Sequence, residues 1–98
     1  MTITQVSTAQ VSDETVRTTT LDIIVDELEL DVEPEEVDLA ADLIEVYGAD
    51  SLGLIQVLAR VNKQLGIRVP REKAVDLRTV ELLIQQIIDI RDGKDGDQ

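Results

Sequence analysis

Residues 48–70 read GADSLGLIQVLARVNKQLGIRVP. This stretch contains the start, the apolar stripe and the end of one predicted helix. Between Ser51 and Leu65 the apolar residues recur at the spacing of an amphipathic helix. Gly66 follows at the position where a left-handed residue commonly ends a helix. The expected core stripe of this helix contains Leu54, Val57, Leu58, Val61 and Leu65. The sequence therefore predicts a helix over residues 51–65, entered from a loop that contains Gly48.

A first helix is predicted upstream, over residues 14–29. Its helical apolar stripe contains Leu21, Ile24, Val25 and Leu28. Ser12 or Thr15 is expected to cap it, because a hydroxyl oxygen accepts a hydrogen bond from the unpaired N–H groups at a helix start. Pro34 prevents this helix from continuing through the connection at 31–50. We expect this long connection to be pinned to the core by Val32, Val37, Leu39, Leu43, Ile44 and Val46.

The C-terminal third predicts a short helical turn over 72–75 and a last helix over 80–90. Thr79 is the expected cap of the last helix. The apolar stripe of that helix contains Val80, Leu83, Ile84, Ile87 and Ile88. We therefore expect an all-α fold: a four-helix bundle with three main helices, one short helix and a long loop between the first two.

The composition excludes several classes of chemistry. The chain has 98 residues, no Cys, no His and a single aromatic residue, Tyr47. Disulfides, iron–sulfur clusters, the usual zinc sites and Cys–His or Ser–His nucleophile pairs are therefore excluded. We see no apolar run that could span a membrane and no secretory signal. We expect a monomeric, cytoplasmic domain over 13–91, with mobile tails at 1–12 and 92–98.

The formal net charge of −12 is unevenly distributed along the chain. Residues 1–50 contain 14 acidic residues and one basic residue, whereas residues 51–98 contain seven acidic and eight basic residues. Nucleic acid is not an expected partner, because phosphate binding needs a dense basic patch. The 12 acidic residues between Asp22 and Asp50 are expected either to serve as docking charge or to keep the protein in solution.

Ser51 is the main candidate for chemistry, because it lies at the junction between loop and helix. Unpaired N–H groups and a partial positive charge at a helix start favour a phosphate attached there. Asp50 is adjacent and is suited to positioning a metal or a partner's cation. The alternative interpretation is that Ser51 is only the capping residue of the helix.

The wider sequence resembles the acyl carrier protein family from Leu43 to Ile87, and more loosely over most of residues 15–90. The matching features are GADSL at 48–52, the apolar helix after the serine, LGIRVP at 65–70 and the start of the last helix at Thr79-Val80. The Asp-Ser-Leu triplet alone is a weak signal. Asp-Ser-Leu followed at this spacing by LGIRVP and then by Thr79-Val80 is a strong signal.

The resemblance implies a four-helix carrier domain with Ser51 as the attachment site for 4'-phosphopantetheine and Asp50 as its motif neighbour. In the family a separate phosphopantetheinyl transferase moves that group from coenzyme A, with a divalent metal. Acyl, ketide or aminoacyl intermediates are then held as thioesters and presented to acyltransferases, ligases or ketosynthases in trans. The carrier itself has no catalytic residues and no metal site, so the chain is not expected to be an enzyme.

The predicted 51–65 helix has a second apolar stripe in addition to the one that its buried face requires. It contains Leu52, Ile55 and Ala59, and the resemblance places it where partner enzymes bind. The expected partner-binding set adds the polar residues around it and comprises Leu52, Ile55, Gln56, Ala59, Arg60 and Lys63. The alternative is that Ile55 and Ala59 pack on the long loop or the short helix. Tyr47 is expected either to pack in the core with its hydroxyl in water or to line the mouth of an acyl pocket.

The predicted 51–65 helix departs from the family pattern, because it contains no acidic residue. Carriers of dissociated fatty acid synthesis usually have a strongly acidic helix here, and charge rejects wrong partners. The sequence therefore predicts a specialised carrier of polyketide or mixed peptide-polyketide biosynthesis. Alternatives are a carrier of fatty acid synthesis, a peptidyl or aminoacyl carrier, and a non-covalent helical adaptor that binds its partner through the Leu52–Ile55–Ala59 stripe.

Overall fold

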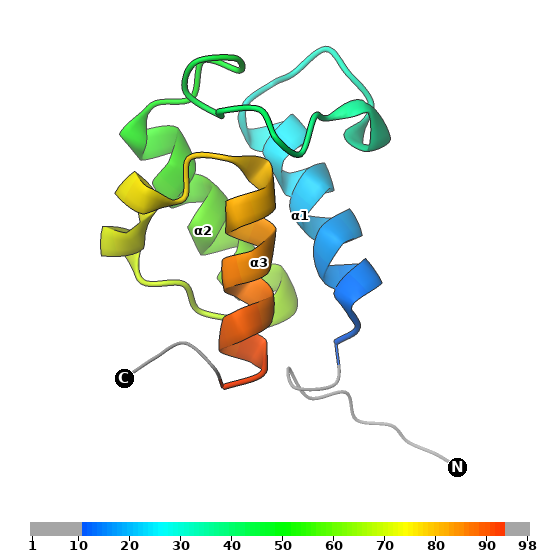
Figure 1. Cartoon of the computed structure of the whole chain (residues 1–98), viewed down its shortest axis with the longest axis vertical. Helices are drawn as coiled ribbons and strands as arrows, with labels where there is room; N and C mark the ends of the chain where they lie inside the picture. Colours follow the sequence, from blue (N-terminus) through cyan, green and yellow to red (C-terminus); the bar gives the residue numbers. More distant parts are fainter. Residues whose placement is uncertain (1–10, 94–98) are drawn as a thin grey trace.

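The protein is a bundle of three α-helices with one long crossing loop, shown in Figure 1 as a computed structural model that describes residues 11–93. The helices, in chain order, are α1 (Asp13–Glu27), the 3₁₀ helix η2 (Pro34–Glu36), α2 (Ser51–Leu65), the 3₁₀ helix η3 (Arg71–Asp76) and α3 (Val80–Arg91). Between residues 11 and 93 the only strand-like pairing is an isolated antiparallel bridge between Asp42 and Thr79. The predicted all-α bundle is confirmed.

Helix α1 starts and ends close to the predicted positions. Ser12 is its cap, and its Oγ accepts a hydrogen bond from the N–H of Thr15 at 3.1 Å. At the other end Glu29 has a left-handed backbone (φ 53°), and the N–H of Leu30 donates to the carbonyl of Val25. This pairing is a Schellman motif, which usually has glycine at its left-handed position. The motif ends α1 before Pro34, so the proline is not what stops it.

The buried face of α1 is wider than the single stripe predicted for it. Leu21 and Ile24 are buried as expected, but Val25 and Leu28 are only half-buried. The face also includes Val16, Thr20 and Ile23, each fully buried. The physical reason is that α1 packs against both α2 and α3, which together cover more of its surface than one helix would.

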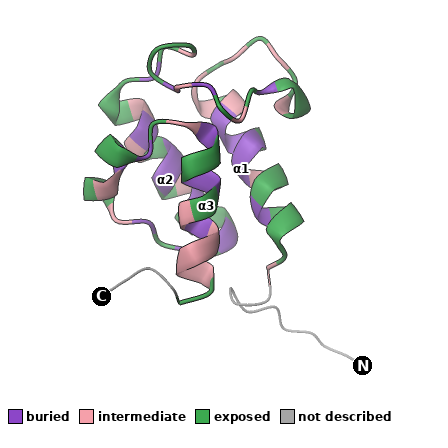
Figure 2. Cartoon of the chain, viewed as in Figure 1, coloured by how far each residue is buried: buried purple, intermediate pink, exposed green. Residues whose placement is uncertain are grey.

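Helices α2 and α3 follow the sequence prediction almost residue for residue. All five residues of the predicted α2 stripe are buried, and Gly66 ends the helix with a left-handed backbone (φ 72°). Four of the five residues of the α3 stripe are buried, whereas Ile88 is half-buried. Thr79 caps α3 by accepting a hydrogen bond from the N–H of Leu82 at 3.1 Å. Figure 2 shows the buried faces of the three helices turned toward each other.

The loop between α1 and α2 crosses the end of the bundle at which α2 begins (Figure 1). Leu43 is fully buried, and its N–H donates to the carbonyl of Arg78 at 2.6 Å. The N–H of Glu81 donates to the carbonyl of Leu39 at 2.8 Å. The loop is therefore fastened to the start of α3, as the prediction of a pinned connection requires. The prediction was wrong for Ile44 and Val46, which are exposed.

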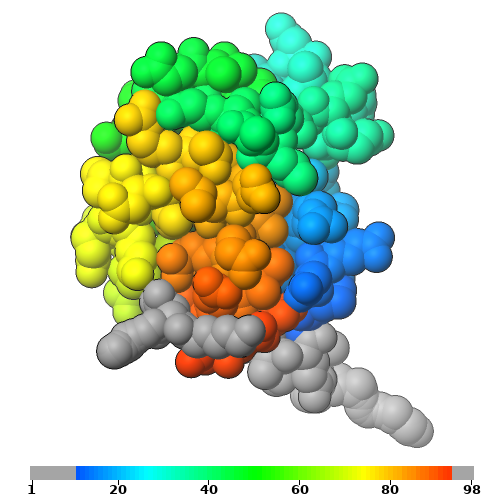
Figure 3. Space-filling view, viewed as in Figure 1, coloured from blue at the N-terminus to red at the C-terminus, as the bar shows by residue number. Residues whose placement is uncertain are grey.

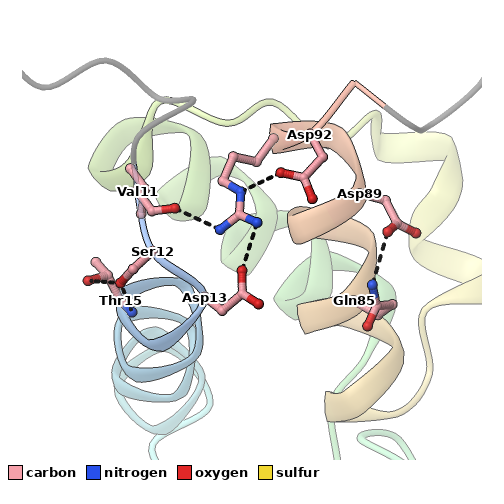
Figure 4. Close-up of polar contacts among 8 residues, drawn as sticks. Val11, Ser12, Asp13, Thr15, Gln85, Asp89 and Asp92 are labelled. Carbon is pink, nitrogen blue, oxygen red and sulfur yellow. Dashed lines mark hydrogen bonds and ion pairs between the residues drawn. The ribbon is translucent and has the colours of Figure 1, made fainter.

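The ends of the described chain are held by one arginine. The Arg91 guanidinium donates to the carbonyl of Val11 at 2.7 Å and pairs with Asp13 at 2.7 Å and Asp92 at 2.9 Å. Figure 4 shows Val11, Asp13 and Asp92 converging on it. Val11 and Ser12 thus belong to the folded domain, although the sequence placed them in a tail. Asp92, which the sequence placed in the C-terminal tail, caps the end of α3, and the N–H of Gly93 donates to the carbonyl of Ile90. The other predicted tail residues, 1–10 and 94–98, lie outside the described residues.

Candidate functional site

Ser51 is exposed at the first turn of α2, and it is not the capping residue. Asp50 has that role, because its Oδ1 accepts a hydrogen bond from the N–H of Gly53 at 2.8 Å. The interpretation of Ser51 as only a cap is therefore wrong. Among the described residues, none forms a hydrogen bond with the Ser51 hydroxyl. The hydroxyl is thus available for reaction at a helix end whose dipole favours an attached anion.

The turn before Ser51 fixes where that hydroxyl points. Gly48 has a left-handed backbone (φ 72°), which a residue with a side chain adopts only with strain. Ala49 follows it and is buried, and its N–H donates to the carbonyl of Leu43 at 3.0 Å. The loop residue Leu43 therefore anchors the start of α2 from inside the core. This anchoring places Asp50 and Ser51 on the surface at a defined position.

A hollow of about 180 Å³ adjoins Ser51. Its lining is contributed by the loop, α2, η3 and the turn before α3, and consists of Ile44, Ser51, Leu54, Ile55, Arg71, Ala74, Val75 and Arg78. Most of these side chains are aliphatic, and two are arginines. Sequence reasoning identified Ser51 here but missed Arg71, Val75 and Arg78. No local pattern marks these three residues, because η3 and the turn before α3 bring them to the hollow only when the chain folds.

Arg78 is one of the two arginines of this hollow, and acidic residues of the loop hold it. Its guanidinium pairs with Asp42 at 3.0 Å and with Glu45 at 3.6 Å. The pKa of Asp42 is lowered, first by the hydrogen bond from the N–H of Glu45, then by that from the N–H of Ile44 and by the charge of Arg78. Desolvation of Asp42 acts in the opposite direction and is outweighed. The ion pair joins the loop to the turn before α3 at the edge of the hollow.

The predicted partner-binding residues form one exposed side of α2. Leu52 is 62% exposed, and Ala59, Gln56 and Lys63 are exposed as well. Ile55 is half-buried, packs against the core and lines the hollow with residues of η3. The alternative that Ile55 and Ala59 pack within the domain is therefore partly correct for Ile55. It is not correct for Ala59, which is exposed.

Arg60 differs from the other members of the predicted set, because its charge is used within the domain. Its guanidinium pairs with Asp26 at 2.5 Å and with Glu27 at 3.1 Å, both on α1. The pKa of Arg60 is raised above its usual value, first by the hydrogen bond to Asp26 and then by that to Glu27. The residue thus joins α1 to α2.

Tyr47 packs against the core, as the first of its two expectations required. Its hydroxyl oxygen accepts a hydrogen bond from the N–H of Asp38 at 3.0 Å, so it braces the loop instead of reaching only water. Tyr47 does not line the hollow beside Ser51.

Within residues 11–93, no group of three or more acidic side chains is arranged to hold a metal ion. None of the helices in that range has the length and apolar character needed to cross a membrane.

The fold and the exposed serine define a small helical carrier domain. The family model described as a phosphopantetheine attachment site matches residues 19–87. The chain belongs to this family, the acyl carrier proteins, whose prosthetic group is a covalently attached 4'-phosphopantetheine.

Curated relatives agree with this assignment. An acyl carrier protein of Amoebophilus asiaticus is 34% identical over 68% of this chain and 81% of its own length. One of Bdellovibrio bacteriovorus is 35% identical over 61% of this chain and 74% of its own length. A third, of Wolinella succinogenes, is 32% identical over 60% of this chain and 78% of its own length.

The residues at the start of α2 fit this prosthetic group. The Ser51 hydroxyl is exposed and has no hydrogen-bond partner among residues 11–93. Asp50 uses its carboxylate to bind the N–H of Gly53, so it caps the helix without occupying the serine. The hollow next to Ser51 offers an apolar surface on which an attached chain can lie.

Proposed function

We propose that Ser51 carries the 4'-phosphopantetheine arm and that the chain presents acyl, ketide or aminoacyl intermediates to partner enzymes. The observation that supports this most strongly is the division of roles at the start of α2. Asp50 caps the helix, which leaves the exposed hydroxyl of Ser51 free to be a nucleophile. An unmodified helical adaptor has no need of that arrangement.

The attachment reaction requires only the hydroxyl from this chain. The Ser51 Oγ attacks the phosphorus of coenzyme A that bears the pantetheine, and a new P–O bond forms. The pyrophosphate bond breaks, the nucleotide bisphosphate leaves with the electron pair, and a base of the transferase takes the serine proton. The arm supplies the thiol for thioester chemistry, which a chain without Cys otherwise lacks.

The proposed partners are a phosphopantetheinyl transferase and the enzymes that load and use the arm in the cytoplasm, namely acyltransferases, ligases or ketosynthases. The chain lacks His and Cys and is proposed to act as their substrate, not as an enzyme. We further propose polyketide or mixed peptide-polyketide biosynthesis as the setting. The support is α2, which has no acidic residue and exposes Leu52, Ala59 and Lys63 to a partner.

Co-expression with a broad-specificity phosphopantetheinyl transferase, followed by intact-protein mass spectrometry, tests the attachment. The wild-type chain should gain the mass of one phosphopantetheine group, and Ser51→Ala should gain none. Ser12→Ala is the matched control, because it removes a hydroxyl from the start of another helix, and it should be modified like wild type. No modification of the wild type, or modification of Ser51→Ala, would contradict the proposal.

The proposed setting has a separate test. The modified chain is offered to a ketosynthase of dissociated fatty acid synthesis and to one of polyketide synthesis, with the same acyl group on both. We expect faster turnover with the polyketide enzyme. Equal or faster turnover with the fatty acid enzyme would favour the housekeeping alternative and leave the attachment itself intact.

A further inference from the structure

A second hollow lies on the outer side of α2, and nothing in the attachment of the arm uses it. It has a volume of about 230 Å³. Its lining comes from the C-terminal part of α2 and from the segment that leads into η3, and consists of Ile55, Leu58, Ala59, Asn62, Arg68, Val69 and Arg71. Four of these side chains are aliphatic and two are arginines. The hollow therefore combines an apolar floor with a cationic edge.

We propose that this α2–η3 face, defined as Ile55, Ala59, Arg68 and Arg71 with the neighbouring Lys63, docks an acidic partner. The partner surface that fits it presents one large apolar side chain flanked by carboxylates. The proposal deepens the proposed function, on which it rests, by naming the chemistry of the enzyme surface that approaches the arm. The apolar side chain fills the hollow, and the carboxylates pair with the arginines.

The cations of the α2–η3 face are available because no acidic side chain among residues 11–93 pairs with them. Within the described part of the chain, Arg68, Arg71 and Lys63 are exposed and form no ion pair. The acids of η3, Glu72 and Asp76, are also exposed and do not pair with these three cations. A free guanidinium beside an apolar floor is suited to a carboxylate on a partner.

Three of the four other arginines within residues 11–93 behave differently. Arg60, Arg78 and Arg91 each pair with two carboxylates and so join parts of the domain. The fourth, Arg17, is exposed on α1. Arg68 and Arg71 differ from all four because they lie beside the apolar floor of the second hollow.

The second hollow lies next to the one beside Ser51. Ile55 and Arg71 line both, so a partner seated on the α2–η3 face lies next to the serine. Figure 3 shows η3 (yellow) and α1 (blue) on opposite sides of α3. Helix α1 and its acidic side chains thus lie away from η3, whereas the acidic loop reaches the hollow beside Ser51 through Ile44. An acidic partner is attracted to the α2–η3 face and repelled by α1, which favours an approach from the side of η3.

Two synthetic helical peptides serve as probes of this face. One presents a leucine flanked by glutamates, and the other replaces each glutamate with lysine. Each is titrated into the full chain at low salt, while backbone amide signals are followed by NMR. We expect the acidic peptide to shift the signals of Ile55, Ala59, Arg68 and Arg71, and to bind more weakly as salt is added. The lysine peptide should leave them unchanged.

Arg71→Glu should weaken binding of the acidic peptide about fivefold, because it replaces an exposed attraction with a repulsion. Arg17→Glu is the matched control: it makes the same charge change at an exposed cation of α1 and should leave the affinity unchanged. Amide spectra of both variants verify that the fold is retained. Equal weakening by the two variants would show a general charge effect and overturn the proposal.

Further outcomes separate this proposal from the proposed function. Ser51→Ala should bind the acidic peptide normally, because docking does not need the arm. A chain that is modified at Ser51 but shows no shift on the α2–η3 face with millimolar peptide keeps its function and loses this inference. Shifts of the same residues with protein concentration alone would indicate a second copy of the chain as the occupant, and would also overturn it.

Discussion

The region from α1 to the end of the loop, residues 13–50, and the region of α2 and η3, residues 51–76, carry opposite charges that serve different purposes. In the first region Asp26 and Glu27 hold Arg60, while Asp42 and Glu45 hold Arg78. Its acids are thus partly structural. The second region exposes the apolar side chains of Leu52 and Val75. Within residues 11–93 its exposed cations Lys63, Arg68 and Arg71 form no ion pair. The sign of the chain's net charge therefore does not indicate which part of its surface binds a partner.

The largest expected effect concerns the loop, whose Leu43 is fully buried in the core. Leu43→Ala should lower the free energy of unfolding by about 2–5 kcal/mol, because it empties a fully buried site. Urea denaturation followed by circular dichroism measures it. Ile44→Ala is the matched control, since its side chain is 38% exposed, and it should change stability by less than about 1 kcal/mol. Equal effects would show that the loop is not part of the core.

A smaller effect of opposite sign is expected at Thr20 on α1. The residue is 0% exposed, and its hydroxyl has no hydrogen-bond partner among residues 11–93. Thr20→Val keeps the shape and removes that unpaired polar atom, so it should stabilise the domain by about 1 kcal/mol. The control is Thr18→Val at an exposed position of the same helix. Destabilisation by Thr20→Val would mean that the hydroxyl has a partner in solution.

The division between structural and unpaired cations predicts different responses on the same helix. Arg60→Gln should lower the urea midpoint at low salt, because it removes the pairing with Asp26 and Glu27. The decrease in the urea midpoint should be smaller in 1 M salt, where the Debye length is about 3 Å and the ion pairs are screened. Lys63→Gln, at an exposed and unpaired position, should leave the midpoint unchanged. If both substitutions lower the urea midpoint equally, the distinction between structural and unpaired cations is wrong.

The smallest effect is a pH dependence at the Asp42–Arg78 pair. Because the pKa of Asp42 is lower in the folded chain, its carboxylate stabilises the fold above the ordinary aspartate pKa of about 4. That contribution disappears as the pH falls through the lower folded pKa. The stability difference between wild type and Asp42→Asn should therefore be present at pH 7 and shrink below about pH 4. Glu35→Gln, in η2, controls for the change in net charge; a difference that grows in acid would contradict the assignment.

The sequence predicted the regular elements well and the packing between them less well. The bounds of α2, the caps Thr79 and Gly66 and the buried stripes follow from local patterns, and local patterns set those features physically. The cap at Asp50 was missed, because both Asp and Ser are good capping residues and only the backbone decides between them.

The surroundings of Ser51 depended on contacts distant in the chain. Arg71 reaches the serine's hollow through the packing of η3 on α2, and Arg60 loses its availability through α1. Neither pairing leaves a periodic signal in the sequence. The exposed stripe of α2 was predictable because it is a property of one helix. The position of Arg68 and Arg71 beside that stripe could be seen only in the folded structure.

The most direct test of the account is the position of the arm on the unmutated chain. The chain has three serines, Ser7, Ser12 and Ser51. Proteolysis of the modified protein and fragmentation of its peptides by tandem mass spectrometry assign the phosphopantetheine to one residue. The account predicts that all of it is found on Ser51. Phosphopantetheine on Ser12 or on any other residue would contradict the division of roles between Asp50 and Ser51.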